Sequence, residues 1–136
     1  MIAPTAAMKT MPGHDLITAG VDVGSSSVKV AILRDQADGS ADVLTLHSDR
    51  IRRRDLRKVI REGYSAALEE TGLSPSDVAY VASTGEGELV DFRRGHFYGM
   101  TTHARGASFL MPQARAVLDV GALHARAMVV DSRSRV

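Results

Sequence analysis

The stretch VDVGSSSVKVAIL, residues 21–33, places an aspartate, a glycine and three serines between two apolar runs. The first run starts at Leu16, and both runs are short and rich in β-branched residues, which is typical of buried strands. Because only a few residues separate them, we expect them to be antiparallel neighbours. A polar turn containing Asp38-Gly39 follows, and residues 41–47 then predict a third strand. The opening of the chain is therefore predicted to be a three-stranded antiparallel meander, with Ser25–Ser27 at its first turn.

A helix and further strands are predicted after this meander. Apolar residues recur at helical spacing over 55–71, and Gly72 then provides a stop. A strand over 78–83 follows, and the connection through a helix favours parallel pairing with a right-handed crossover. Residues 86–100 contain Gly87, Gly95 and Gly99 and give no clear assignment. The remaining expected elements are a helix over 102–111 and strands over 116–120 and 125–130.

Composition limits the kind of protein. The 136 residues are 44% apolar, which suits one ordinary domain. The net charge of +1 predicts no general attraction to nucleic acid or to a membrane surface. The absence of cysteine excludes disulfides and thiolate-bound metals or clusters within this stretch. Residues 1–15 lack the apolar core of a secretory signal and predict a flexible N-terminal extension, so the expected location is the cytoplasm.

The same local pattern occurs twice, as GVDVGSSSVKVAIL over 20–33 and as VLDVGALHARAMVV over 117–130. In each copy an aspartate precedes a glycine at a turn between two strands. Gly24 and Gly121 are expected to adopt a backbone conformation that would be strained for other residues, and to let a phosphate approach the main chain. Backbone amides at such a turn, with the Ser25–Ser27 hydroxyls, can donate hydrogen bonds to phosphate oxygens.

Charged residues in the two turns complete half of a phosphoryl-transfer site. Lys29 can neutralise charge near a β- or γ-phosphate, while Asp22 or Asp119 can hold Mg²⁺ directly or through water. Phosphoryl chemistry depends mainly on positioning and charge neutralisation. A single Asp-x-Gly between strands is often an ordinary turn, but its repetition and the serine run favour a phosphate site. Neither a Walker loop nor a Rossmann fingerprint is present.

Four motifs follow one another along the chain. They are Asp22 to Lys29, Thr84-Gly85-Glu86-Gly87, His103-Ala104-Arg105-Gly106-Ala107 and Asp119-Val120-Gly121. The arrangement resembles the actin, sugar-kinase and Hsp70 ATPase superfamily. Within it, the chain is similar to the BadF/BadG/BcrA/BcrD-type ATPases, which include ATP-binding subunits of benzoyl-CoA reductase and are related to activators of 2-hydroxyacyl-CoA dehydratases. Dehydratase activators usually carry Gly-Gly-Gln-Asp in the second loop, whereas Gly121-Ala122-Leu123-His124 resembles the reductase branch.

The resemblance implies an α/β, ribonuclease-H-like (actin-like ATPase) domain over 16–136, forming the N-terminal half of a two-domain fold whose second domain is missing. The implied function is ATP hydrolysis coupled to low-potential electron transfer for the reduction of benzoyl-CoA. The implied cofactors are ATP, Mg²⁺ and a [4Fe–4S] cluster whose cysteines this chain lacks. The implied partners are a second ATPase subunit, the CoA-ester-reducing subunits and ferredoxin.

Turn chemistry and resemblance together predict the site residues. Asp22 and Asp119 are expected to be catalytic and to hold Mg²⁺. The residues expected to contact the nucleotide are Gly24, Ser25, Ser26, Ser27, Lys29, Gly121, Ala122 and His124.

Other interpretations stay open. The chain could belong to a dehydratase activator, to a carbohydrate or acyl kinase with a substrate-binding second domain, or to a non-catalytic fragment. His96, His103 and His124 lack metal-ligand spacing, and His103 is expected to pack near the sheet. The arginine-rich run over 50–61 is interpreted as a solvated helix face rather than a binding surface.

Overall fold

The two opening apolar runs form neighbouring antiparallel strands, β1 (Leu16–Val23) and β2 (Ser27–Asp35), in a computed structural model that describes residues 15–136. A turn at Gly39, whose φ of 87° is left-handed, leads into β3 (Ala41–Arg50), which pairs antiparallel with β2. The predicted meander is therefore confirmed. The predicted extension over 1–15 lies outside the described residues except for Asp15.

Helix α1 (Leu56–Thr71) has the expected bounds because both of its ends carry cap residues. Asp55 accepts a hydrogen bond from the Lys58 amide at 2.9 Å, and Gly72 adopts a left-handed conformation after the last turn. The chain then enters β4 (Val78–Gly85) through a short 3₁₀ helix, η1 (Pro75–Asp77). Strand β4 pairs parallel with β1, as predicted for a connection through a helix.

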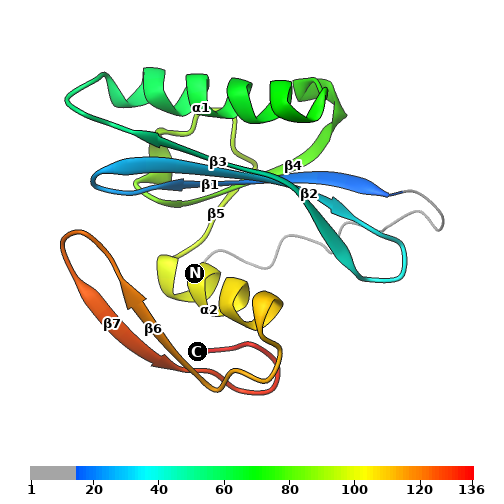
Figure 1. Ribbon diagram of the computed structural model, residues 1–136, viewed down its shortest axis with the longest axis vertical. Coiled ribbons are helices and arrows are strands. Elements are labelled where there is room, and N and C mark those ends of the chain that lie inside the picture. The colour runs from blue at the N-terminus through cyan, green and yellow to red at the C-terminus, as the bar shows by residue number, and fades with distance from the viewer. Residues whose placement is uncertain (1–14) are drawn as a thin grey trace.

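The core lies between α1 and one face of a sheet of five strands in the order β3-β2-β1-β4-β5 (Figure 1). Side chains alternate across a strand, so every second residue of β1 and β2 faces the helix. Each fully buried aliphatic side chain contributes about 1.5–3 kcal/mol relative to an exposed one. The buried hydrophobic residues of these three elements are Ala19, Val21, Val23, Val28, Val30, Ile32, Val59, Ile60, Tyr64, Ala67 and Leu68.

Residues 86–100, which gave no assignment from sequence, follow the edge of the sheet. They form a short 3₁₀ helix, η2 (Gly87–Leu89), and a two-residue strand, β5 (Gly95–His96), which pairs parallel with β4. Glycine is needed here for close packing. A Cβ added at Gly85 would lie 2.3 Å from the Val23 carbonyl oxygen, and one at Gly87 would lie 2.6 Å from the Ser83 Cβ.

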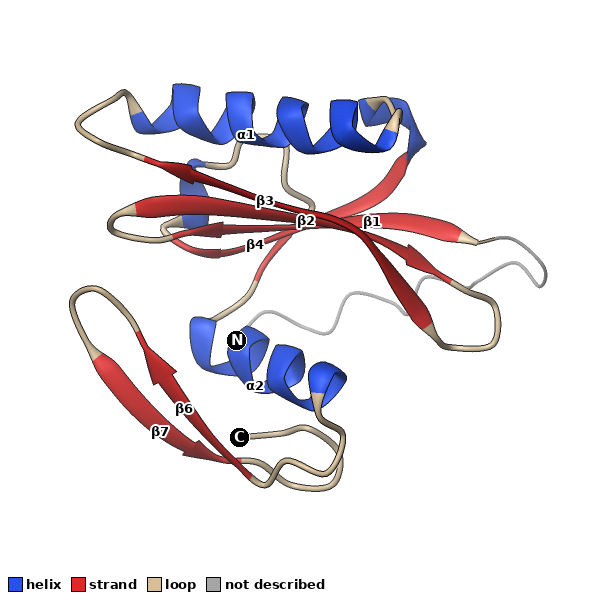
Figure 2. Ribbon diagram, viewed as in Figure 1, coloured by secondary structure: helices blue, strands red, loops and turns tan. Residues whose placement is uncertain are grey.

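A second layer lies across the sheet from α1 (Figures 1 and 2). It consists of α2 (Gly99–Leu110) and the hairpin of β6 (Ala116–Val120) and β7 (Ala125–Val129). Helix α2 begins three residues earlier than the predicted 102. The hairpin is a separate two-stranded sheet that is not hydrogen-bonded to the other five strands. The extent of the predicted domain, 16–136, therefore stays a prediction.

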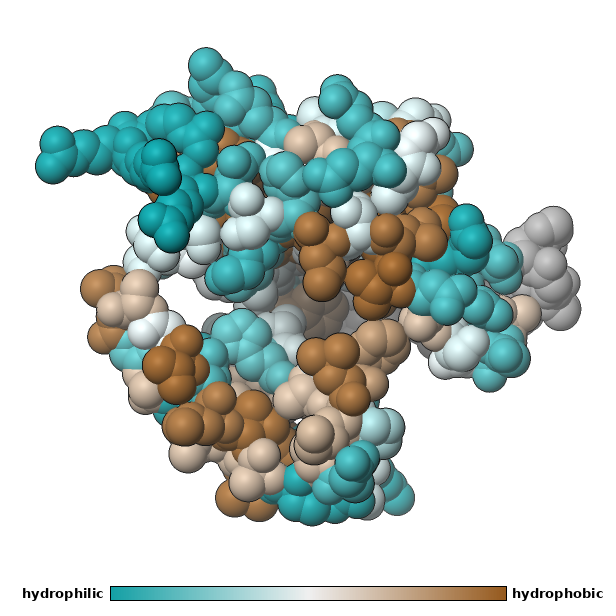
Figure 3. Space-filling model, in the orientation of Figure 1, coloured by the Kyte–Doolittle hydropathy of each residue, from teal (hydrophilic) through white to brown (hydrophobic). Residues whose placement is uncertain are grey.

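The β6–β7 hairpin buries little apolar surface. Met128 and Val130 are buried, but Leu118, Val120 and Val129 are 71%, 71% and 78% exposed. The space-filling view accordingly shows brown, apolar side chains gathered over α2 and the hairpin, whereas the surface over α1 is mostly teal (Figure 3). Across residues 15–136, neither helix is long and apolar enough to span a lipid bilayer.

The close approach of Gly85 to β1 generates a stability prediction. Gly85→Ala should lower the free energy of unfolding of the chain by about 2 kcal/mol or more, because φ is left-handed and the new Cβ meets backbone. Chemical denaturation measures this. Gly20→Ala is the control on β1, since its Cβ meets nothing within 4 Å, and it should change stability by less than about 0.5 kcal/mol. Equal effects of the two changes would contradict the packing argument.

A histidine on β3 that bonds a glutamate of α1 leads to a pH prediction. His47 Nδ1 lies 2.9 Å from Glu70 Oε1, and this hydrogen bond raises the pKa of His47 above its ordinary 6.5. The protonated ring is therefore favoured in the folded state. Its contribution to the free energy of unfolding is complete below pH 6.5 and is lost as pH rises through the raised pKa.

His47→Gln should remove this pH dependence. Urea unfolding of both chains from about pH 5 to about pH 9 measures it, and the stability difference between them should shrink as pH rises. A difference that is constant across that range would show that the charge on His47 contributes nothing.

Candidate functional site

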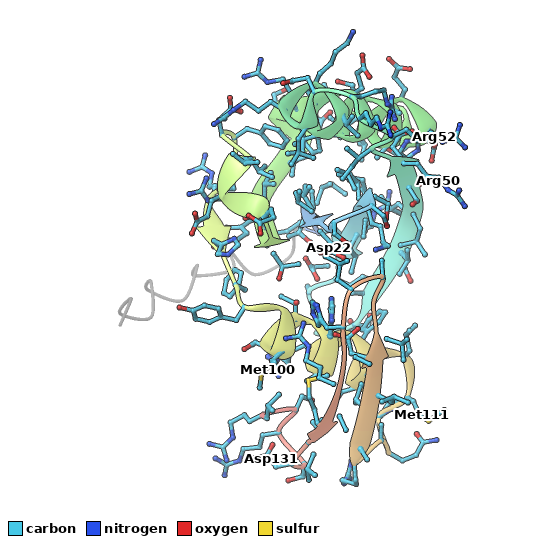
Figure 4. All side chains as sticks on the ribbon, turned by 90° about the vertical axis from the view of Figure 1, so that its left-hand side faces the viewer. Asp22, Arg50, Arg52, Met100, Met111 and Asp131 are labelled. Carbon is cyan, nitrogen blue, oxygen red and sulfur yellow. The ribbon has the colours of Figure 1, made fainter. Side chains whose placement is uncertain are left out.

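Both predicted loops lie on the same side of the molecule. The β1–β2 turn, the end of β4 and the β6–β7 turn all point to the left in Figure 1. Figure 4 looks onto this side and shows Asp22 between the sheet and the β6–β7 hairpin. Parallel pairing explains part of this arrangement, since β1 and β4 end at the same edge of the sheet.

The first turn is tight. The Gly24 amide donates to the Ser27 carbonyl at 2.9 Å, and a Cβ on Gly24 would lie only 3.2 Å from that oxygen. Left-handed glycines in residues 15–136 are limited to Gly39, Gly72 and Gly85. The expectation that Gly24 and Gly121 adopt a strained backbone is therefore wrong, and glycine is favoured by the close approach of the carbonyl instead.

The serines of the first turn face outward. Ser25 and Ser26 are exposed, and the hydroxyls of Ser25–Ser27 form no hydrogen bond within residues 15–136. The backbone of the next loop is connected to the turn, since the Ile51 amide donates to the Ser26 carbonyl at 2.9 Å. The turn is thus fixed while its hydroxyls remain available to a ligand.

The second turn has the same backbone form with different side chains. The Gly121 amide donates to the His124 carbonyl at 2.8 Å, and a Cβ on Gly121 would lie 3.2 Å from that oxygen. Ala122, Leu123 and His124 are all exposed. This turn therefore resembles the first in shape but offers a ligand only backbone amides and the His124 ring.

A row of polar side chains crosses the sheet face opposite α1. Asp22 is paired with Lys29 on β2 and with Thr84 on β4. The Lys29 Nζ lies 3.5 Å from Asp22 Oδ2, and the Thr102 hydroxyl of α2 donates to the Thr84 hydroxyl at 3.3 Å. These residues lie around a cavity of about 400 Å³ between the sheet and α2. Its other lining residues include Gly20, Ala31, Ala82 and His103.

Asp119 is held by two cationic or hydrogen-bonding side chains. Its Oδ2 accepts from His103 Nδ1 at 2.8 Å and from Arg126 Nε at 2.9 Å. The hydrogen bond from His103, and then that from Arg126, holds the pKa of Asp119 below its usual range, so the carboxylate is charged at neutral pH. His103 lines the cavity beside the sheet, as expected, but its hydrogen bond goes to β6.

Arg126 was not among the site residues predicted from the sequence. A signal was present, because Arg126 follows Asp119 by seven residues, as Lys29 follows Asp22.

The other two histidines named from the sequence lie apart from Asp119. His96 Nδ1 lies 3.0 Å from the Ser83 hydroxyl, and His124 is exposed in the second turn. The described residues contain no group of three His, Cys, Asp or Glu side chains placed to hold a metal.

The arginine-rich run lies beside the first turn and points into solvent. Figure 4 shows Arg50 and Arg52 extending away from the molecule. Arg54 lies 3.7 Å from Glu62, which also lies 3.7 Å from Lys58, so part of the positive charge is balanced on the surface. The run is therefore solvated, as expected, but it is not a single helix face. Arg50 ends β3 and residues 52–54 form the loop before α1, so only the later cations of the run lie on the helix.

Comparison with known proteins identifies the family. The model of the BadF/BadG/BcrA/BcrD ATPase family matches residues 19–136. The chain is 55% identical over 120 residues to one of the subunits of benzoyl-CoA reductase from Thauera aromatica, covering 88% of this chain and 42% of that protein. It is 32% identical over 124 residues to the activator of lactoyl-CoA dehydratase of Anaerotignum propionicum, covering 89% and 45%.

Solved structures agree on the fold. Component A of (R)-2-hydroxyglutaryl-CoA dehydratase from Acidaminococcus fermentans superposes with a TM-score of 0.77 at 25% identity, covering 85% of this chain and 43% of that one. The chain thus spans less than half the length of these relatives. It has the α/β fold of the actin-like ATPases, as the sequence predicted. The chain belongs to the BadF/BadG/BcrA/BcrD ATPase family.

Proposed function

We propose that the chain provides the phosphate-binding half of a nucleotide site in an ATPase that drives the reduction of benzoyl-CoA or a similar aromatic acyl-CoA. The observation that carries this proposal is the pair of matched Asp-Val-Gly turns on one side of the molecule, each with a cation opposite its aspartate. Family membership and the 55% identity to a component of benzoyl-CoA reductase support the choice of reaction.

Phosphate contacts would come first from the β1–β2 turn. The exposed Ser25 and Ser26 and the half-buried Ser27 offer hydroxyl and amide donors. The turn already holds these donors in place, so binding a phosphate does not require them to be ordered. Lys29, which is 58% exposed and only loosely paired with Asp22, would neutralise phosphate charge. The Gly121, Ala122 and His124 backbone of the second turn would contact the phosphates from the other side.

The donors present fit Mg²⁺, which keeps several waters and takes one or two carboxylates together with substrate phosphates. Asp22 is 29% exposed beside the turn, and Asp119 keeps Oδ1 without a hydrogen bond within residues 15–136. Both can therefore act directly or through water. Bound Mg²⁺ would supply neutralisation of the charge that develops during phosphoryl transfer.

The chain does not fit a [4Fe–4S] cluster, because such clusters are held by thiolates and the chain has no cysteine. If the assembly carries a cluster, its ligands come from residues other than these. The proposed partners, namely a second ATPase subunit, CoA-ester-reducing subunits and ferredoxin, are supported by the resemblance to the family and by the multi-subunit nature of its named relatives.

Activation of a 2-hydroxyacyl-CoA dehydratase is the second candidate. Its support is the 32% identity to the lactoyl-CoA dehydratase activator and the 0.77 TM-score with a related component. The higher identity to the reductase component and the Ala-Leu-His side chains of the second turn favour the reductase.

The phosphate-site assignment predicts a loss of ATP turnover. Asp22→Asn in the complete gene product should lower the ATP hydrolysis rate by about 100-fold or more, because it removes the carboxylate charge beside the first turn that is proposed to hold Mg²⁺. Asp42→Asn is the matched control, since Asp42 bonds Gln36 at the opposite end of the sheet and should change turnover less than about twofold. Unchanged hydrolysis by Asp22→Asn would overturn the assignment.

The choice of reaction is tested with the subunits that copurify with the complete protein. In the presence of a low-potential reductant and MgATP, we expect ATP-dependent loss of the aromatic absorbance of benzoyl-CoA. ATP-dependent dehydration of a 2-hydroxyacyl-CoA, with benzoyl-CoA left intact, would establish the activator function instead. ATP hydrolysis without either reaction would exclude both.

A further inference from the structure

The two hairpins match residue by residue beyond the turn motif. In β1–β2, Asp22 faces Lys29 across the ladder and Val23 faces Val28. In β6–β7, Asp119 faces Arg126 in the corresponding register. Both turn glycines donate to the carbonyl three residues later. Arg126 therefore occupies the position in the second hairpin that Lys29 occupies in the first.

Arg126 is held much more firmly than Lys29. The Lys29 Nζ is 3.5 Å from its aspartate, whereas Arg126 Nε is 2.9 Å from Asp119 Oδ2. His103 Nδ1 lies 2.8 Å from the same oxygen. It therefore holds the Asp119 carboxylate in the position in which that carboxylate binds Arg126. Since Arg side chains lose considerable rotamer freedom when ordered, a preformed orientation lowers the cost of using this one to bind an anion.

The outer nitrogens of Arg126 remain available. A guanidinium has five N–H donors, and only the Nε of Arg126 forms a hydrogen bond within residues 15–136. The missing side chain of Gly99, at the start of α2, makes room for the group, because a Cβ there would lie 2.9 Å from Nη2. The same Cβ would be 3.9 Å from the Thr84 hydroxyl, which places the guanidinium near the row formed by Thr84 and Asp22.

We propose that Arg126, on β7 beside the second turn, contacts phosphate, with Asp119 and His103 as the positioning residues that hold its guanidinium. The inference rests on the proposed nucleotide site and adds a cation to it. Nε would remain on Asp119 while the Nη groups donate to phosphate oxygens, an arrangement that uses the planar fork of arginine. The site would then have a cation in each hairpin, Lys29 and Arg126, opposite each aspartate.

The test uses Arg126→Gln and Arg126→Lys in the complete gene product, with ATP, ADP and AMP as ligands. Arg126→Gln should weaken the binding of MgATP by about 10- to 100-fold, which is typical of a lost charge-assisted hydrogen bond, and leave AMP binding unchanged. Arg126→Lys should recover part of the ATP affinity, because it keeps the charge. Equal loss for AMP and ATP would show a purely structural role and overturn the proposal.

Arg135→Gln is a matched control. Arg135 Nε forms the same bond as Arg126, 2.9 Å to an aspartate Oδ2, but with Asp131 beyond the far end of β7. Figure 4 shows Asp131 at the end of the hairpin away from Asp22. This change should leave the binding of all three nucleotides unaltered. Reduced MgATP affinity here would mean that any lost ion pair weakens the hairpin, and would refute the specific role of Arg126.

Gly99→Ala keeps Arg126 and tests its position if Arg126→Gln does not fold. Displacement of the guanidinium by the new Cβ should lower MgATP affinity and leave AMP binding unchanged. Unchanged MgATP affinity would contradict the placement of Arg126.

Two patterns of results distinguish failure of this inference from failure of the proposed function. If Asp22→Asn abolishes turnover but neither Arg126 nor Gly99 variants alter MgATP binding, the inference alone fails. If Asp22→Asn has no effect, the nucleotide site fails with it.

Discussion

Strand β1 is hydrogen-bonded along both edges, antiparallel to β2 and parallel to β4, and the rest of the structure depends on this double pairing. One face of β1 delivers Ala19, Val21 and Val23 to the core under α1. The alternate residues, with Asp22 last, face the opposite layer. A register slip of one residue would exchange the two faces, so the burial of the valines also fixes the position of Asp22. Core packing and site geometry are therefore consequences of one ladder.

The two turns have the same backbone form but different support. The first belongs to a five-stranded sheet with a helix packed on it. The second belongs to an isolated hairpin whose β-strands expose Leu118, Val120 and Val129. A two-stranded ribbon has little stability of its own in water. Polar contacts accordingly matter more for the second turn. The bond from His103 to Asp119 connects the hairpin to α2, and the bond from Arg126 to Asp119 joins its two strands.

The contacts of Asp119 also leave part of its carboxylate available for chemistry. Its Oδ2 accepts both hydrogen bonds, so its Oδ1 can bind a cation or a water. The same bonds hold the guanidinium of Arg126 in one orientation beside Gly99. Ion pairing in this region thus contributes mainly to the orientation of charged groups, since exposed or half-exposed pairs stabilise a fold by about 1 kcal/mol at most.

The sequence predicted helices and strands well where the residues that indicate an element are also the ones that stabilise it. Asp55 and Gly72 end α1 by capping it, and the apolar alternation of β1 and β2 reflects the faces they present. The signals were weaker where glycine serves packing. Gly87 was one of the glycines that left residues 86–100 without an assignment, and the strand predicted over 78–83 runs on to Gly85. Glycine is favoured at these two positions by the approach of β1 and by contact with Ser83. The expectation of a strained backbone at Gly24 and Gly121 was wrong, and glycine is favoured there by the close approach of a carbonyl oxygen instead.

By itself the sequence determined the meander, the capped helix, the order of the motifs and the two Asp-Val-Gly turns, because each depends on residues that are close together in the chain. Only the tertiary structure decided that His103 bonds Asp119, that Gly99 makes room for Arg126, and that Asp22, Lys29 and Thr84 form one row. Those relations join residues on different elements. They depend on strand register and on how α2 packs between the sheet and the hairpin, and a local pattern does not encode either.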